Sequence, residues 1–387
     1  MYHDPHFPMI ERRRPAAAPF VPPPAPRRRR ARWAALGLAL ALAAGGAGAW
    51  QAFSKDKVAV PHGAPVYWGV NLAGGEFAPD DDNAEYGKNY IYPDAKIAAP
   101  FVAAGMNVVR LPLRWERIQP WPQAMLSPIE SKRLDETLDG LSDVPLVILD
   151  IHNFGAFHKE PLRADAKSAD MLADLWRRLA LRYKDRPNIA FGLMNEPVDM
   201  DAREWRQLAD STVAAIRGTG ARNLILVPGV SWTGAHSWMQ GGAGSNAEAM
   251  KGFRDPGGNF AIEMHQYLDG DSGGHGADCV DRRVAIDRMR DATDWLRENH
   301  YRGFLGEFAT GSSAQCLDSL DGLMGFLNTN GDVWMGWTWW AAGPWWGDAW
   351  NNIQPDDKTG DRPQMAVLRR YIGGRPDTAA PAPESAR

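Results

Sequence analysis

The sequence has little of the material from which metal and redox sites are built. Only two of its 387 residues are cysteine, nine are histidine, and neither a CxxC nor an HExxH motif occurs. Because zinc sites need clustered cysteine and histidine ligands, we expect no metal and no other cofactor. In an exported domain the single pair Cys279 and Cys316 favours one disulfide, with two separate thiols as the alternative.

A strong charge of either sign is also missing. The formal net charge is -4 and the sequence pI is about 6.2. A polyanionic partner needs a basic patch or stripe, and the conspicuous basic residues here are confined to the N-terminus. We therefore expect no nucleic-acid binding.

The N-terminus is expected to lie outside the folded domain. Residues 1–32 are rich in proline and arginine and predict a disordered cytoplasmic arm. Residues 33–53 begin with an uncharged run near the lower length limit of a membrane span, which favours an anchor; a signal peptide cleaved near "AGA" is the alternative. Either way the chain from residue 54 onward is exported, to the periplasmic or cell-envelope side if anchored and into the medium if cleaved. Residues 54–65 are expected to be a linker, and 374–387 a disordered tail.

Residues 66–373 alternate apolar runs with helix-period segments. Only the link after the fifth run lacks a convincing long helix. Apolar strands joined by helices indicate a parallel sheet covered by helices, and eight units predict an α/β fold of the (β/α)8 TIM-barrel type. A doubly wound open sheet would instead need a Gly-rich phosphate loop, and "GVNLAGGEF" after the first strand is not GxGxxG. The predicted strands are 66–72, 107–113, 144–151, 189–194, 223–228, 260–266, 303–308 and 333–340.

Polar side chains gather where these strands end, which is where TIM barrels place their chemistry. Glu196 and Glu307 end the fourth and seventh strands and are expected to face each other across the barrel mouth. The other polar or aromatic residues at these positions are Arg110, His152, Asn153, Asn195, His265, Tyr267, Trp339 and Trp340.

Two carboxyl groups suit the hydrolysis of a glycosidic bond. One protonates the leaving oxygen and the other opposes the oxocarbenium charge; a gap of about 5 Å gives retention and about 6.5–9.5 Å gives inversion. Arg110 and the Tyr267 hydroxyl are placed to keep one carboxylate ionised while its partner stays protonated. Singly, each residue has a plainer interpretation, such as a structural Arg110–Glu307 ion pair, a core histidine or a packed tryptophan. Their shared position favours an active site.

With these residues in place, the chain resembles glycoside hydrolase family 5, and most of all its subfamily 5 endoglucanases, over about residues 66–372. The ordered set of segments carries the resemblance, whereas the N-terminal arm and apolar segment lie outside the family pattern. The matching segments are "VVRLPL", "DIHN", "NEP" at 195–197, "HQYLDGDSGGHGADC", "GEF" at 306–308 and "WWAAGPWWGD".

The resemblance implies a role for each matching residue. Glu196 would be the general acid/base and Glu307 the nucleophile of a double displacement. Asn195 would bind the sugar 2-hydroxyl, and Arg110 and Tyr267 would orient Glu307. His152 and His265 would complete the polar ring, and Trp340 would be the sugar-stacking platform, with Trp339 as the alternative in register. The resemblance also supports a Cys279–Cys316 disulfide in an oxidising compartment.

We therefore expect a monomeric, retaining endo-β-1,4-glucanase (cellulase) that acts on a β-glucan polysaccharide. Another β-glycanase specificity (mannan, xyloglucan or mixed-linkage glucan) is one alternative. A non-catalytic or tethered glucan-binding factor in polysaccharide synthesis is another, although a pure binder has no evident need for both Glu196 and Glu307. Two or three of the tryptophans that follow strands are expected to bind successive sugars; the candidates are Trp115, Trp121, Trp232, Trp238, Trp345 and Trp346.

Overall fold

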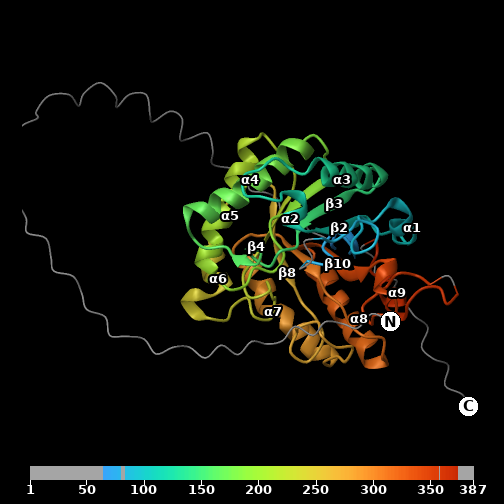
Figure 1. The fold of residues 1–387 in the computed structure, drawn as a ribbon. Helices are drawn as coiled ribbons and strands as arrows, with labels where there is room; N and C mark the ends of the chain where they lie inside the picture. The colour runs from blue at the N-terminus through green and yellow to red at the C-terminus, as the bar shows by residue number, and fades with distance from the viewer. Residues whose placement is uncertain (1–63, 80–82, 357, 374–387) are drawn as a thin grey trace, which may run out of the picture. The chain divides into compact units, whose positions relative to one another are not determined.

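The structure is a computed structural model that describes residues 64–79, 83–356 and 358–373 (Figure 1). The predicted basic arm (1–32), the apolar segment (33–53), most of the linker (54–65) and the tail (374–387) lie outside the described residues. Within the described ranges, no helix has both the length and the apolar character needed to cross a membrane.

Eight strands form a closed parallel barrel in the order β1-β10-β9-β8-β7-β6-β3-β2. The barrel and all eight predicted strand positions are confirmed, with ends that differ by one to a few residues. An antiparallel hairpin, β4 (Ala156–Phe157) and β5 (Glu160–Pro161), projects from the loop after β3. The barrel strands are β1 (Tyr67–Leu72), β2 (Val108–Leu113), β3 (Leu146–Ile151), β6 (Ile189–Gly192), β7 (Ile225–Pro228), β8 (Phe260–His265), β9 (Gly303–Glu307) and β10 (Trp334–Ala342).

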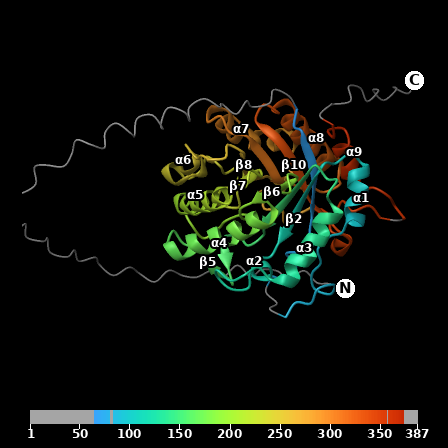
Figure 2. The ribbon, with the colours of Figure 1, turned by 90° about the horizontal axis from the view of Figure 1, so that it is seen from above.

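Helices surround the barrel in chain order (Figures 1 and 2). Most of them begin at a side-chain cap; in α5, for example, Asp201 and Glu204 form a reciprocal capping box. The link after the fifth barrel strand, β7, contains only the five-residue α6 and a 3-10 turn, as its weak helical pattern predicted. The helices are α1 (Ala95–Ala103), α2 (Trp115–Ile118), α3 (Pro128–Gly140), α4 (Ala166–Tyr183), α5 (Ala202–Gly218), α6 (Asn246–Met250), α7 (Arg282–Glu298), α8 (Ala314–Thr329) and α9 (Pro363–Leu368).

The strands bury both of their faces, which explains their continuous apolar sequences. Outward residues such as Val109 and Val147 belong to the large core between strands and helices. Inward residues form a separate apolar cluster that fills the N-terminal half of the barrel. Its members are Val108, Leu146, Ile148, Ala190, Leu224, Leu226, Ala261, Phe304 and Met335.

A charged layer lies directly above this apolar plug. Successive inward positions on a strand are two residues apart, so Arg110 follows Val108, Asp150 follows Ile148, and Glu263 follows Ala261. All three side chains are fully buried. On β9 the corresponding position is Gly306, where an added Cβ would lie only 2.2 Å from Glu263 Oε1. The plug and the missing side chain thus leave room for a buried charge cluster just below the C-terminal mouth.

Candidate active site

Glu307, the last residue of β9, is held at both carboxylate oxygens. Arg110 Nη1 donates to Oε1 over 2.9 Å, and the Tyr267 hydroxyl donates to Oε2 over 2.6 Å. Burial raises the pKa of Glu307, whereas the cationic His265 and Arg110 oppose that rise. The two donors also fix the orientation of the carboxylate.

Glu196 lies in the loop after β6, at a left-handed backbone position with φ of 42°. A glutamate rarely adopts this conformation, and such residues gather at functional sites. The preceding amide anchors the loop, because Asn195 N–H donates to Ile151 O over 2.7 Å. Glu196 Oε1 lies 2.6 Å from His265 Nδ1. Carboxylate oxygens of Glu196 and Glu307 lie within 4.8 Å of each other.

Arg110 joins the elements of the site from below. Besides Glu307, its guanidinium lies 3.1 Å from Asp150 Oδ1 and 3.0 Å from Glu263 Oε1. It also donates to Asn195 Oδ1 over 2.8 Å, which orients the residue that precedes Glu196. Three neighbouring carboxylates outweigh the cost of its burial and raise the pKa of Arg110. One side chain from β2 therefore contacts groups on β3, β8 and β9 and in the loop after β6.

The two predicted histidines differ in charge. Burial alone lowers the pKa of a histidine, and it lowers that of His152 to about 3, so this ring is neutral. For His265 the burial effect is outweighed by Glu307 and by contacts with Glu196 and Glu263, which raise the pKa to about 10. His265 therefore carries a positive charge at neutral pH and donates through Nδ1 to Glu196.

The closing strand β10 supplies the aromatic side of the site. Trp340 is partly exposed and stacks on His152, with ring centroids 5.2 Å apart and planes inclined by 10°. Trp339 points the opposite way: it is fully buried, and its Nε1 donates to Asn351 O over 2.8 Å. Adjacent strand residues face opposite sides, so only Trp340 presents its ring near the polar residues.

The structure brings together the eight residues that the sequence assigned to catalysis and to the ring around it: Glu196, Glu307, Arg110, His152, Asn195, His265, Tyr267 and Trp340. Two buried carboxylates in contact with the site, Asp150 and Glu263, were missed. A signal for both exists in the sequence: each precedes a nominated histidine, His152 or His265, by two positions. Residues with this spacing on a strand face the same side, so the nominated histidines indicate which way Asp150 and Glu263 point.

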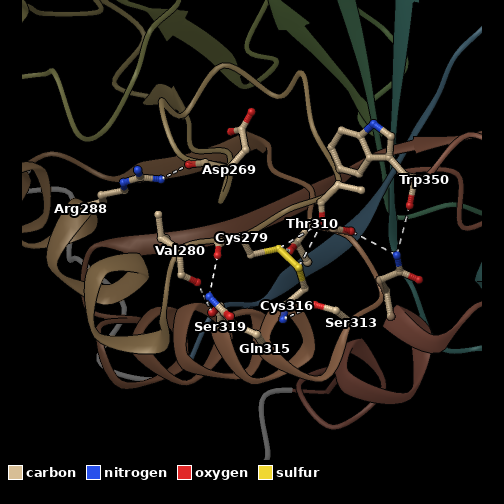
Figure 3. The surroundings of a disulfide bond; sticks show 12 residues. Asp269, Cys279, Val280, Arg288, Thr310, Ser313, Gln315, Cys316, Ser319 and Trp350 are labelled. Carbon is tan, nitrogen blue, oxygen red and sulfur yellow. Dashed lines mark hydrogen bonds between the residues drawn. A yellow bond between two sulfur atoms is a disulfide. The ribbon is translucent and has the colours of Figure 1, made fainter.

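The disulfide between Cys279 and Cys316 is confirmed and ties the long loop after β8 to the first turn of α8 (Figure 3). Two hydrogen bonds reinforce it: Gln315 Nε2 donates to Cys279 O over 2.7 Å, and Ser319 Oγ donates to Val280 O over 2.6 Å. Tyr267 lies at the start of this loop. The bridge therefore helps to restrain the segment that supplies a donor to Glu307.

Some tryptophans in the loops face solvent and others do not. Trp121, Trp232 and Trp345 have exposed fractions of 68%, 61% and 40%, so they are available to a ligand. Trp115 and Trp238 are fully buried and only pack the loops. The prediction that two or three of the six candidates bind sugars therefore rests on the other four, because a strand-following position does not decide which way a side chain turns.

Within the described part of the chain, one group of three acidic or histidine side chains has oxygen and nitrogen atoms close enough together to hold a cation. It consists of Glu196, His265 and Glu307. A doubly protonated His265 has no free lone pair to offer a metal. The chemistry of this set therefore fits proton transfer better than metal binding.

Comparison with known proteins places this arrangement among cellulases. The model of Cellulase (glycosyl hydrolase family 5) matches residues 62–343. Endo-beta-1,4-glucanase B of Aspergillus niger is 34% identical over 327 residues, which cover 81% of this chain and 95% of that protein. XacCel5A, solved in complex with cellopentaose, has 44% identity and a TM-score of 0.77 over 79% of this chain and 98% of that one. Endoglucanase Cel5A of Pseudomonas stutzeri, solved with cellobiose, has 31% identity and a TM-score of 0.72 over 81% and 94%.

Proposed function

The chain belongs to glycosyl hydrolase family 5, and we propose that it is an endo-β-1,4-glucanase that hydrolyses internal β-1,4-glucosidic bonds with retention of configuration. The Aspergillus niger relative named above is an endo-β-1,4-glucanase, and the two solved relatives hold cellopentaose or cellobiose. One observation carries the stereochemical part: oxygens of Glu196 and Glu307 lie within 4.8 Å. Retaining enzymes separate the two carboxyl groups by about 5–5.5 Å, whereas inverting enzymes need about 6.5–9.5 Å.

In the first step, Glu307 is the nucleophile and Glu196 the general acid. A carboxylate oxygen of Glu307 forms a bond to the anomeric carbon as the bond to the leaving oxygen breaks. Glu196 gives its proton to that oxygen, so the aglycone leaves as an alcohol. The hydrogen bonds from Arg110 and Tyr267 orient the carboxylate of Glu307 for attack, and the charges of His265 and Arg110 oppose the rise in its pKa that burial causes.

In the second step, water replaces the leaving group and Glu196, now ionised, acts as the base. It takes a proton from the water as the oxygen attacks the anomeric carbon, and the bond to Glu307 breaks. Two inversions give net retention. Glu196 recovers its proton and Glu307 its charge, so the site is ready for another cycle.

Substrate contacts surround this centre. Asn195 Oδ1 is taken by Arg110, whereas its buried Nδ2 has no hydrogen-bond partner within the described residues. An unsatisfied buried donor is costly, so Nδ2 fits a sugar 2-hydroxyl next to the cleaved bond. His152 and His265 complete the polar ring, and the ring of Trp340 offers a flat face for the C–H surface of a glucose unit. One chain supplies all of these groups, so the proposed chemistry needs no residue from a second copy.

We also propose that the domain is exported. A polymeric β-glucan lies outside the cytoplasm, and the Cys279–Cys316 disulfide suits an oxidising compartment. Whether residues 33–53 form an anchor or a cleaved signal is tested by sequencing the N-terminus of the mature protein. An intact N-terminus in the membrane fraction supports the anchor, and a start near residue 50 supports cleavage.

The activity is tested by reducing-sugar release from carboxymethylcellulose, barley β-glucan and glucomannan. The full chain is compared with Glu307→Gln, which keeps the shape of the side chain and removes the nucleophile. We expect release from the first two substrates that is lost in the variant. Release from glucomannan alone would show that the protein is a mannanase. Binding without release of reducing sugar from any of the three substrates would refute the proposed enzymatic activity.

A further inference from the structure

Glu263 is a fully buried glutamate that the proposed mechanism does not use. It lies on β8, two positions before His265, and its side chain fills the space left by Gly306 on β9. Glu263 Oε1 is 3.0 Å from Arg110 Nε and 3.5 Å from His265 Nε2. Neither contact has the alignment of a good hydrogen bond, so both are ionic contacts.

Each of these two cations contacts one of the catalytic carboxylates. Arg110 holds Glu307 through Nη1, and His265 holds Glu196 through Nδ1. Glu263 is therefore one contact away from both reacting groups, on the side of the site opposite the barrel mouth. A burial cost of several kcal/mol per ion makes such a carboxylate expensive to keep unless it is well compensated.

We propose that Glu263 is a positioning residue: it keeps His265 doubly protonated and so keeps a donated hydrogen bond on Glu196 throughout the reaction cycle. This inference rests on the proposed roles of Glu196 and Glu307. It assigns Glu263 no contact with substrate.

The charges around His265 support this role. Its ring faces carboxylates from three elements: Glu196 after β6, Glu263 on its own strand and Glu307 on β9. The opposing cation is Arg110 on β2, and the neutral His152 and the buried Asp150 also lie near. Arg110 and His265 lower the pKa of Glu263 despite burial, so Glu263 is ionised.

Asp150 shows why Glu263 carries the charge. Both carboxylates contact Arg110, and two like charges so close cannot both ionise freely. Burial raises the pKa of Asp150 to about 7. The pKa of Glu263 is lowered, because Glu263 contacts a second cation, His265, besides Arg110. The more strongly ionised member of the pair thus lies beside the protonated histidine, and Asp150 lies beside the neutral His152.

The consequence for the chemistry concerns Glu196 alone. When Glu196 gives up its proton in the first step, its new negative charge lies 2.6 Å from a cationic donor. His265 keeps its own two protons, so no proton passes through it, and the same donor is present when Glu196 takes a proton from water. A neutral imidazole would stabilise the ionised Glu196 less in both steps.

The test replaces Glu263 with glutamine, which has nearly the same shape and no charge. We expect kcat on a soluble β-glucan to fall about tenfold or more, which is less than the roughly 10²–10⁴-fold contribution of a general acid/base itself because Glu263 acts through His265, while KM changes less than twofold. In histidine NMR spectra the pKa of His265 falls by at least one unit. Glu130→Gln is the matched control, because Glu130 is a buried glutamate that accepts hydrogen bonds from Tyr90 and Tyr92 away from the site.

Two results overturn the proposal. One is that Glu263→Gln has the same kcat and the same pKa of His265 as the unchanged protein. The other is a change in KM with kcat intact, which indicates a role in binding. If the variant does not fold, the unchanged protein decides: His265 must stay doubly protonated from about pH 5 to pH 8 while His152 stays neutral. A neutral His265 there refutes the inference. Because this spectrum needs no substrate, it is independent of whether the glucanase assay succeeds.

Discussion

Arg110 is the side chain whose loss should disturb the molecule most. Its guanidinium lies 2.9–3.1 Å from three buried carboxylates, those of Glu307, Asp150 and Glu263. Arg110→Gln removes the cation and leaves the acids. Breaking a buried ion pair by removing one partner costs about 3–5 kcal/mol. In a domain of this size about 2 °C accompanies each kcal/mol, so Tm should fall by roughly 6–10 °C.

The loss should depend on pH in a defined direction. With Arg110 present, the pKa of Glu263 is lowered, and its contribution to stability exists above its unfolded pKa and is lost as the pH falls. Without the arginine, burial raises the pKa values of all three acids. The contribution of these three acids to the free energy of unfolding is then fully present below their unfolded pKa values and is lost as the pH rises. The deficit in the free energy of unfolding should therefore be smallest near pH 5 and largest near pH 8.

Chemical denaturation at several pH values measures this deficit. Arg297→Gln is the control, because Arg297 forms a solvent-exposed ion pair with Asp332 and should contribute less than about 1 kcal/mol. A deficit for Arg110→Gln as small as that of the control would refute the reasoning. So would a large deficit that does not change with pH, since it would point to lost packing and not to unpaired charge.

Three further predictions concern other parts of the domain. Trp340→Ala should raise KM for cello-oligosaccharides by up to about tenfold with a smaller effect on kcat, because stacking contributes about 0.5–1.5 kcal/mol; in steady-state kinetics, an unchanged KM would contradict the platform. Replacing Cys279 and Cys316 with serine should lower the free energy of unfolding by up to about 4 kcal/mol, the loop-entropy value for a sequence separation of 37 residues; a urea midpoint equal to that of the unchanged protein would count against it. Burial raises the pKa of Glu76 to about 8. The contribution of Glu76 to the free energy of unfolding is therefore fully present at low pH and is lost as the pH rises through its folded pKa. Glu76→Gln should therefore match the unchanged protein in Tm near pH 5 and exceed it near pH 9, and the reverse order would show the sign to be wrong.

The positions of the proposed catalytic residues could be predicted because barrel topology largely determines them. Once eight apolar runs are recognised as parallel strands, the residue after each run must lie at the same mouth. Glu196 and Glu307 follow different strands far apart in the chain, yet this rule alone places them together. The same rule placed Trp340 there and left only its register against Trp339 open.

The charged layer below the mouth was harder to foresee. Asp150 and Glu263 lie inside apolar strands, and what they contact depends on the side chains of neighbouring strands at the same height. Gly306 provides the clearest example, because its missing side chain makes room for a carboxylate on another strand. The distance between the carboxylates of Glu196 and Glu307 is set by this packing, so the sequence could not supply it. The sequence could not say which loop tryptophans face solvent for a related reason, since the orientation of a loop side chain such as Trp238 is decided by tertiary contacts.

The most direct test of the central claim is to trap the covalent intermediate. A 2,4-dinitrophenyl 2-deoxy-2-fluoro-β-cellobioside has a leaving group good enough for the first step, and its fluorine slows both steps by destabilising the oxocarbenium-like transition state. The account predicts that mass spectrometry of peptides finds one 2-deoxy-2-fluorocellobiosyl group, a disaccharide, attached to Glu307, and that NMR of the cleavage of an ordinary substrate shows the β-anomer first. An adduct on another residue, or the α-anomer as the first product, would contradict it.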